Sequence, residues 1–464
     1  MRFTIAQLEA FFWTAQLGSL SKAAGHLHMA QPTISLRLRD LEKALGVRLF
    51  QKSGRGLALT SEVGFGIAQH HRGCLLETAI DRIELFALSC RLPDRIGNAV
   101  RFFDRRETLL VRITTRGGAI GWGETWALPA PAAALVQTTL GPAALGEDIR
   151  YPAKIWRKLA SFIANDRRGL THMAISALDM ATWDASARAD GLPLSAKLGG
   201  ALREKLSCYV SGPFLKPTPN PFAHYLDEIG GYLDRGFRNI KVRAGIGARA
   251  DAALIAATRS RIGADIGLMV DFNEAGDIAQ TLDFSRRVAD ADLIWLEEPV
   301  LHDDPASWKR VSAEAGLALA GGESLYGLAG FRDFLCAGVF SVAQPDIALC
   351  GGLTEALRIA ALAEAFNVPV APHVWGGAVN FNASLHFAAI LPDRTWPGRR
   401  FPFFEYDASF NPLRTAFADC PVGENGLVAV PKGAGIGLDI RESELAPLLT
   451  ARHELKQSNS KATN

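Results

Sequence analysis

The stretch DLIWLEEPV at residues 292–300 decides the fold, because it joins a short apolar run to two adjacent carboxylates. Leu293–Leu296 is apolar throughout, which is typical of a strand in a parallel sheet whose two faces are both covered. Glu297 and Glu298 follow directly, and Pro299 ends the run. A carboxylate at the end of a buried strand is costly unless it meets a cation or a hydrogen-bonding partner. The stretch therefore predicts a buried strand that ends in a polar site.

Two other apolar runs end in an acid at the same spacing. GLMVDFN at 267–273 leads into Asp271 and GLALAGGES at 316–324 leads into Glu323, so the steps from 271 to 297 and from 297 to 323 are both 26 residues. One strand–helix unit of a parallel barrel has about this length, and neighbouring strand ends there share one face. Three carboxylates on that face suit Mg²⁺, which prefers oxygen ligands. The alternative is three unrelated acids, each hydrogen-bonded to loop amides.

From Leu206 onward the chain alternates between short apolar runs and helical patterns. The runs expected as strands are 206–212, 239–245, 267–273, 292–298, 316–324, 340–346, 368–374 and 402–407. Parallel strands with intervening helices predict a TIM-type barrel, whose active site lies at the carboxyl ends of its strands. Residues 79–205 read instead as a smaller α+β block, placed like a lid.

The other strand ends add basic and acid–base groups. The second strand carries Lys241 and Arg243 on one side, the sixth ends in Asp346, the seventh holds His373 and the eighth holds Glu405. A histidine beside an aspartate can act as a base, because the carboxylate fixes the imidazole tautomer and raises its basicity. Taken singly, His373 reads as a structural histidine, and Lys241 and Arg243 read as surface ion-pair residues. Their common place at strand ends favours a catalytic site.

Residues 1–60 show three short helical patterns and then two short strand-like runs. In the third helix, Gln31–Leu45, apolar residues form one stripe, and small polar and basic side chains lie off it near the helix start. Such a helix suits a DNA major groove, and a basic wing after it can hold a phosphate backbone. The DNA-binding candidates are Gln31, Thr33, Ser35, Arg37 and Arg39 on the helix and Lys52 and Arg55 on the wing. A small helical bundle used for dimerisation fits the pattern equally well.

Charge and composition also divide the chain. Residues 1–80 hold nine Lys or Arg against five Asp or Glu, although the 464 residues together have a formal charge of only +2. A basic first segment points to nucleic acid and a near-neutral body to an enzyme. The six cysteines are scattered without a CxxC pair, which indicates reduced thiols. With no signal peptide and no membrane-length apolar run, we expect a cytoplasmic protein with no membrane partner.

Residues 3–65 resemble the winged helix-turn-helix of LysR-type transcription regulators. The motifs that carry the resemblance include SLSKAAGHL (19–27) and AQPTISLRLRDLEKALGVRLF (30–50). The resemblance implies that Gln31–Leu45 reads double-stranded DNA and that the next helix, Ser61–Glu77, mediates dimerisation. The pair Gln51 and Lys52 departs from the family, in which arginine is usual after the LF pair. The chain also does not continue into the effector domain of such regulators.

Residues 80–445 resemble the mandelate racemase group of the enolase superfamily. The shared motifs are KVR (241–243), DFN (271–273), EEP (297–299), GGE (321–323), QPD (344–346), PH (372–373) and FFEYD (403–407). That family abstracts the proton α to a carboxylate and holds the enediolate on Mg²⁺. The resemblance implies that Asp271, Glu297 and Glu323 bind Mg²⁺, that the His373–Asp346 pair is base or acid, and that Glu405 hydrogen-bonds a substrate carboxylate oxygen.

Within this group, GWGE (121–124) and APHVWGG (371–377) are most similar to lactone cycloisomerases and acid-sugar dehydratases. The expected fold is multidomain: an all-α winged helix-turn-helix at 1–60, a linker helix at 61–78, an α+β capping domain at 79–205 plus 411–450, and a (β/α)7β TIM-type barrel at 206–410. Many members read K-x-K where this chain has Lys241-Val242-Arg243. Arginine stays protonated, so Arg243 is expected to supply positive charge rather than act as a base.

Two classes of function follow. The first is a lyase or isomerase, expected as a homo-oligomer, that acts on a sugar acid or lactone and also carries a DNA-binding domain. The second is a transcription regulator whose barrel senses a sugar acid. A third possibility is a fusion or a gene-model artefact, in which residues 1–77 have no role. All metal and dyad residues are present, which favours retained catalysis.

Overall fold

The computed structural model describes residues 4–54, 56–60, 77–166, 169–396 and 399–457. The chain divides into two compact units, Met1–Glu77 and Thr78–Asn464. Each unit has its own apolar core. No helix within the described ranges is both long and apolar enough to cross a membrane.

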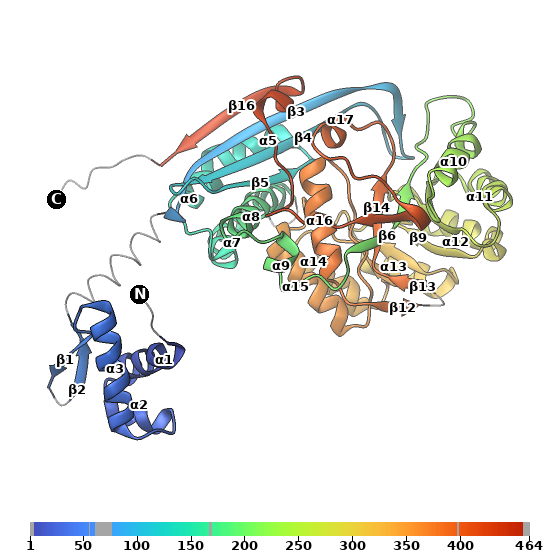
Figure 1. Ribbon diagram of the computed structural model, residues 1–464. Coiled ribbons are helices and arrows are strands. Elements are labelled where there is room, and N and C mark those ends of the chain that lie inside the picture. Colours follow the sequence, from blue (N-terminus) through green and yellow to red (C-terminus); the bar gives the residue numbers. More distant parts are fainter. Residues whose placement is uncertain (1–3, 55, 61–76, 167–168, 397–398, 458–464) are drawn as a thin grey trace. The chain divides into compact units, whose positions relative to one another are not determined.

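The described residues of the first unit form three helices and a two-stranded antiparallel wing (Figure 1). The elements are α1 (Ile5–Leu17), α2 (Leu20–His26), α3 (Gln31–Leu45), β1 (Phe50–Ser53) and β2 (Gly56–Leu59). Ile34, Leu38 and Leu41 of the expected stripe on α3 are buried, so this helix packs as the sequence predicts. The linker helix expected at 61–78 lies outside the described residues, apart from its last two positions.

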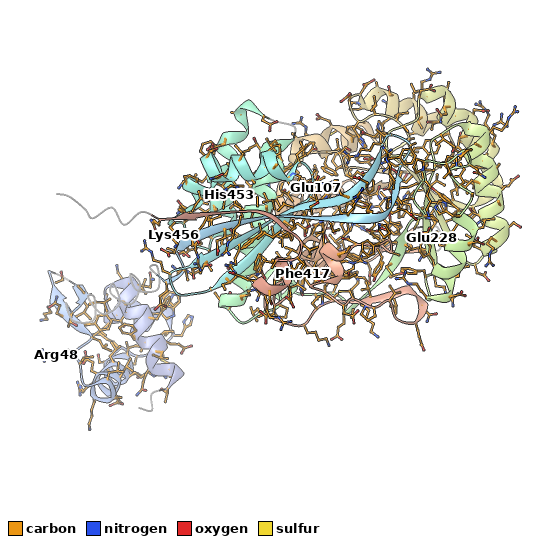
Figure 2. The ribbon with its side chains drawn as sticks, turned by 90° about the horizontal axis from the view of Figure 1, so that it is seen from above. Arg48, Glu107, Glu228, Phe417, His453 and Lys456 are labelled. Atoms are coloured by element: carbon orange, nitrogen blue, oxygen red, sulfur yellow. The ribbon has the colours of Figure 1, made fainter. Side chains whose placement is uncertain are left out.

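The second unit begins with a four-stranded antiparallel sheet in the order β16-β3-β4-β5. The strands are β3 (Ile80–Gly97), β4 (Phe102–Thr115), β5 (Ile120–Thr125) and, from the far end of the chain, β16 (Leu449–Lys456). Figure 2 looks down on this sheet, with Glu107 of β4 and His453 of β16 labelled. The strands continue through charged residues because these pair across the sheet, as Arg112 does with Glu84 at 2.8 Å.

Helices cover one face of this sheet and form the capping block with it (Figure 1). They are α5 (Pro129–Leu135), a π-helical segment (Val136–Leu140), α6 (Gly141–Ala144), α7 (Pro152–Ala160), a 3-10 turn (Ser161–Asn165) and α8 (Leu170–Ala189), followed by α9 (Leu194–Lys197). Helix α8 approaches β5 so closely that a Cβ on Gly123 would lie 1.8 Å from the carbonyl oxygen of Ala177. The small residues of α8 allow this close packing.

The second sheet of this unit consists mainly of parallel strands that curl into a TIM-type barrel, in the order β11-β10-β9-β8-β7-β6-β14. The strands are β6 (Lys205–Ser211), β7 (Asn239–Arg243), β8 (Gly267–Asp271), β9 (Leu293–Glu297), β10 (Leu319–Gly321), β11 (Val342–Ala343) and β14 (Phe403–Asp407). All residues of β7, β8 and β14 are buried, as expected for parallel strands covered on both faces. A short antiparallel strand, β15 (Leu427–Ala429), also pairs with β6.

Outer helices follow the barrel strands in chain order, as the alternation predicts. They are α10 (Tyr225–Asp234), α11 (Ala248–Ile262), α12 (Ile278–Arg287), α13 (Pro305–Glu314), α14 (Gly327–Ala337), α15 (Gly352–Ala365) and α16 (Ala378–Ile390). The smaller elements are a 3-10 turn (Ala289–Ala291), the hairpin β12 (Arg394–Trp396) and β13 (Arg399–Phe401), α17 (Pro412–Thr415), a second 3-10 turn (Glu424–Gly426) and α18 (Glu442–Leu445).

The segment expected as the seventh strand, 368–374, forms only one parallel bridge, between Val370 and Ala343. Pro369 and Pro372 lack backbone N–H groups, so a continuous ladder cannot form there. What remains is an exchange in which Ala343 N–H donates to Pro369 and Ala371 N–H donates to Ala343, both at 3.0 Å. The expectation of a regular strand at this position is wrong, although the segment still runs beside β11.

Candidate active site

The three evenly spaced acids meet at the carboxyl ends of β8, β9 and β10. Asp271 is in register with Glu297 across β8 and β9, and Glu323 lies two residues after Gly321, the last residue of β10. Carboxylate oxygens of the three acids all lie within 4.8 Å of one another. Asp271 and Glu297 are buried, and Glu323 is partly exposed. The common spacing in the sequence therefore corresponds to a common position in space.

Neighbouring side chains orient these acids through hydrogen bonds that sequence reasoning did not assign. Trp295 Nε1 and Gln344 Nε2 donate to Oε2 of Glu297, at 2.9 and 2.7 Å. The backbone N–H and the side-chain amide of Asn273 donate to Asp271, at 2.8 and 3.1 Å. Asn273 and Gln344 belong to the DFN and QPD motifs, and this membership could have indicated their place in the site. Trp295 lies within an apolar run, where its N–H group gives no signal.

Lys241 extends from β7 into the middle of the acids. Its Nζ contacts Glu297, lies 2.9 Å from Glu405 and 3.4 Å from Asp271, and its side chain is fully buried. Burial acts to lower the pKa of Lys241, but the charges of Glu297 and Glu405 outweigh it and hold the pKa well above its usual value. Lys241 is therefore an ammonium ion at neutral pH. It is a source of positive charge rather than a base.

Arg243 lies on the same side of β7 and is held by an aromatic ring. Its guanidinium carbon is 3.9 Å from the centroid of Phe214, and Nη1 donates to Ser211 Oγ at 3.2 Å. Burial acts to lower the pKa of Arg243, but the charges of Asp271 and Glu405 outweigh it and raise the pKa. The site thus contains a second fixed cation that cannot accept a proton.

His373 and Asp346 lie together, as the sequence predicts. Nδ1 of His373 is 2.7 Å from Oδ2 of Asp346, and Nε2 is 3.1 Å from Glu323. Burial acts to lower the pKa of His373, but Glu323 and the other nearby carboxylates outweigh it and raise the pKa to about 10. Asp346 also accepts a hydrogen bond from Trp126 Nε1 at 2.9 Å. Trp126 comes from the capping block, and no local sequence pattern indicates this contact.

Glu405 of β14 lies between the lysine and the histidine. Oε1 is 2.9 Å from Lys241 Nζ, and Oε2 accepts the backbone N–H of Val374 at 2.9 Å and lies 3.9 Å from His373 Nε2. Burial acts to raise the pKa of Glu405, but Lys241 and His373 outweigh it and lower the pKa to about 2. Glu405 is thus ionised and has no proton to donate to a substrate carboxylate. The expected hydrogen bond between Glu405 and a substrate carboxylate oxygen remains a prediction.

The three strand-end acids fit a divalent cation. Burial raises the pKa of Glu323 to about 8 and also raises the pKa of Glu297. Carboxylates held this close, where little water reaches them, resist ionisation, and a cation among them removes that penalty. Three carboxylates supply the hard oxygen ligands that Mg²⁺ prefers, and they leave its other positions to water or substrate. Asp271, Glu297 and Glu323 would hold the ion.

Four aromatic rings, called here the aromatic wall, adjoin the histidine and the arginine. The ring centroid of Trp126 is 6.1 Å from His373 and 6.4 Å from Trp375. Trp375 is in turn 5.9 Å from Phe103 of β4 and 5.5 Å from Phe214, which follows β6. The rings come from four separate segments of the chain, so only folding brings them together. They give the site an apolar side next to the dyad.

Most of the predicted DNA-binding side chains lie on the surface of the first unit. The exposed ones are Gln31, Thr33 and Arg39 of α3 and Lys52 of β1. Ser35 is half-buried, as is Arg37, whose Nη1 donates to the carbonyl oxygen of Ala6 at 3.5 Å. Arg55 lies outside the described residues. Helix α3 therefore presents polar and basic groups at its start, as the recognition helix of a DNA-binding domain does.

Three segments match described protein families. Residues 5–63 match the bacterial regulatory helix-turn-helix proteins of the LysR family. Residues 87–199 match the mandelate racemase/muconate lactonizing enzyme N-terminal domain, and residues 224–444 match the enolase C-terminal domain-like family.

Relatives and solved structures agree with these matches. A D-galactarolactone cycloisomerase from Agrobacterium fabrum is 35% identical over 369 residues, which cover 79% of this chain and 97% of the relative. An arabinonate dehydratase from Saccharolobus solfataricus is 28% identical, over 72% of this chain and 89% of the relative. The crystal structure of a 3,6-anhydro-D-galactonate cycloisomerase from Zobellia galactanivorans superposes with a TM-score of 0.72 at 30% identity, and covers 80% of this chain and all of that one. A racemase from Streptomyces coelicolor, solved with bound magnesium, also has a TM-score of 0.72, at 29% identity and the same coverage.

Proposed function

Because the chain belongs to the mandelate racemase and muconate lactonizing enzyme family of the enolase superfamily, we propose that it removes the α-proton of a sugar-acid carboxylate in a Mg²⁺-dependent reaction. The observation that carries the proposal is the meeting of Asp271, Glu297 and Glu323 beside the His373–Asp346 pair. Such a proton is very weakly acidic, so its removal needs a cation at the developing charge and a base on one face. The site offers groups for both.

Each residue then has one task. Mg²⁺, when bound, would supply positive charge to the substrate carboxylate as its second negative charge develops. Nε2 of His373 takes the α-proton, because a cation held by the acids would offset the carboxylate charge that raises the pKa of His373 to about 10. Asp346 holds Nδ1 and so fixes the ring. Lys241 and Arg243, both cationic, add to the field that stabilises the enediolate. Glu405 keeps the ammonium of Lys241 in place.

The test of this function is a screen of the purified full chain with Mg²⁺ against a library of acid sugars and their lactones in D₂O. Incorporation of deuterium at the α-carbon reports proton removal even where no product accumulates. If no member of the library exchanges its α-proton with solvent, the proposed function is wrong.

The enediolate collapses by elimination when a leaving group sits on the β-carbon. The α-carbon keeps the electron pair of the broken C–H bond, a carbon–carbon double bond forms, and the β-carbon–oxygen bond breaks. A hydroxyl needs a proton to leave, whereas the ring oxygen of a lactone leaves as a carboxylate. Lys241 is tied to carboxylates and Arg243 does not give up its proton, so a leaving hydroxyl would have to take its proton from the imidazolium of His373. A lactone needs no such proton, so it suits this site better than an acyclic acid sugar. The D-galactarolactone cycloisomerase among the relatives supports this choice.

We therefore expect a lactone to be turned over with a kcat/KM about 100-fold above that of the matching open-chain acid. A factor of about 100 is within the range that general acid catalysis usually contributes. Both substrates are assayed with one enzyme preparation, from pH 6 to pH 9. Equal kcat/KM values across that range would mean that the leaving hydroxyl is protonated efficiently and that the protein is a dehydratase.

The first unit gives the protein a second proposed activity. The LysR-type match and the exposed groups of α3 and β1 support binding of double-stranded DNA through residues 1–60. Such domains bind paired half-sites as dimers, so we infer a homo-oligomer. A cytoplasmic location follows from a partner that is chromosomal DNA.

Arg39→Ala is expected to weaken binding to the promoter beside the protein's own gene about 10-fold or more, because a good side-chain-to-base contact is worth about 1–3 kcal/mol. Arg37→Ala is expected to act in the same direction, although its contact with Ala6 gives it a structural part too. Mobility shift at several salt concentrations measures both, and wild-type binding should fall steeply with salt. Arg286→Ala, which removes an exposed arginine of α12, is the matched control. Unchanged binding by both α3 variants would contradict the assignment of the recognition helix.

The LysR-type domain also supports a second candidate function, a regulator that uses the barrel as a sugar-acid sensor. The two candidates differ in one result. A sensor changes its DNA affinity when it binds a sugar acid without turning it over, whereas an enzyme exchanges the α-proton. Retention of the complete acid and dyad set favours the enzyme.

A further inference from the structure

His302 contacts all three strand ends that carry the proposed metal ligands. Its Nδ1 contacts Glu274, three residues after the end of β8, and lies 3.4 Å from Oε1 of Glu298, directly after β9. Its Nε2 faces β10 so closely that a Cβ on Gly321 would lie 3.1 Å from it. Asp271, Glu297 and Glu323 belong to these same three ends, and sequence reasoning gave His302 no role.

The imidazole of His302 is held firmly by packing. Its side chain is only 5% exposed. The ring centroid lies 4.6 Å from Trp308 of α13, 5.3 Å from Phe334 of α14 and 6.5 Å from Phe340. A ring fixed in this way can serve as a rigid support for the loops that it contacts.

The loops that carry these contacts have an unfavourable backbone conformation. Asn273, Glu274 and Glu298 have φ values of 44°, 63° and 42°, in the left-handed region that non-glycine residues avoid. Such conformations persist where surrounding contacts hold them. Here Glu274 N–H donates to the carbonyl of Glu298 at 2.8 Å, and the carboxylate of Glu274 accepts the backbone N–H of His302 at 3.1 Å. The held residues lie within three positions of Asp271 and Glu297, two of the proposed metal ligands.

We propose that Glu274 and His302 are positioning residues, an inference that rests on the proposed function. They keep the ends of β8, β9 and β10 at the separation that lets Asp271, Glu297 and Glu323 bind Mg²⁺. Neither residue needs to touch substrate for this role. It acts through the backbone on either side of the ligands, as partners of metal ligands commonly do.

The same cluster has the composition of a second cation site. Ligand atoms of Glu274, Glu298 and His302 lie within 4.8 Å of one another, and Oε1 of Glu298 is buried without a hydrogen-bond partner. A metal-binding histidine, however, normally donates its other N–H to an acceptor. Nε2 of His302 is buried without a hydrogen-bond partner and adjoins aromatic rings. The geometry therefore favours a support over a second ion, and the experiment separates the two.

The experiment is calorimetric titration of Mg²⁺ into the metal-depleted full chain, with thermal unfolding of each metal-free variant in parallel. Glu274→Gln keeps the carbonyl oxygen that accepts from His302, so its affinity should stay within a few-fold of the wild type. Glu274→Ala removes the acceptor for His302. Glu274→Asp keeps the negative charge, but its shorter side chain does not reach His302. Both variants should therefore bind Mg²⁺ about 10- to 100-fold more weakly than the wild type. Glu314→Ala, an exposed acid of α13 paired with Arg310, is the control expected to bind as the wild type does.

The outcomes separate the possibilities. Wild-type affinity in both Glu274→Ala and Glu274→Asp overturns the proposal, and so does a Glu274→Gln variant that binds no better than they do. Two equivalents of bound cation in the wild type, with one lost in Glu274→Gln, would assign the cluster to a second ion instead. Should Glu274→Ala fail to fold, the comparison of Glu274→Asp with Glu274→Gln still decides. A wild type that binds no Mg²⁺ refutes the proposed function itself, a result distinct from all of these.

Discussion

Glu297→Gln is expected to lower kcat at least about 1,000-fold while the barrel stays folded, because a metal ion supplies several kcal/mol of charge stabilisation in reactions of this kind. The substitution is nearly isosteric but cannot satisfy its surroundings. Oε1 of Glu297 faces the ammonium of Lys241, and Oε2 accepts from Trp295 and Gln344. Whichever way the new amide turns, its NH₂ group meets a donor. The variant therefore loses a metal ligand and also loosens Lys241.

The measurements are turnover of the best substrate from the library screen, Mg²⁺ affinity by calorimetry, and circular dichroism to confirm folding. Chelation by EDTA should abolish wild-type activity, and added Mg²⁺ should restore it. Glu364→Gln, a surface acid of α15 that faces Arg394, serves as the matched control and should behave as the wild type does. Full activity after chelation would exclude the metal-dependent mechanism.

The second large effect is expected for His373→Asn, which should lower kcat by about 100- to 10,000-fold, the range of general base catalysis. Asparagine can still hydrogen-bond Asp346 but cannot take a proton. Mg²⁺ binding should persist, because the proposed ligands are the three acids and His373 is not one of the ligands. Loss of turnover with retained Mg²⁺ binding distinguishes this variant from Glu297→Gln.

Proton exchange in D₂O shows whether His373 acts alone. Lys241 is held as an ammonium ion by Glu297 and Glu405, and Arg243 is protonated at any working pH. We therefore expect exchange for only one C2 epimer of a turned-over substrate, and none in His373→Asn. Comparable exchange of both epimers in the wild type, with one of them unaffected in His373→Asn, would show that a second base operates and that the reading of Arg243 is mistaken.

The sequence by itself determined the strands and what stands at their ends. Parallel barrel strands are buried on both faces, so each appears in the sequence as a continuous apolar run. A polar residue that ends such a run stands out against it. The regular spacing of Asp271, Glu297 and Glu323 predicted that they meet, and the structure brings their oxygens within 4.8 Å. The pairing of His373 with Asp346 followed likewise from neighbouring strand ends. The exception is the segment 368–374, where prolines interrupt the hydrogen bonding that the apolar pattern led us to expect.

Only the tertiary structure decided which groups meet across distant segments and what their protonation states are. Trp126 reaches Asp346 from the capping block, and the aromatic wall is assembled from four parts of the chain. Periodicity reports which face of a strand or helix is buried, but it carries no information on which loops then come together. The charge on Lys241 likewise depends on burial and on Glu405, a residue more than 160 positions later in the chain. The support that His302 gives to three strand ends is of the same kind, because it exists only where three loops and two helices pack around one ring.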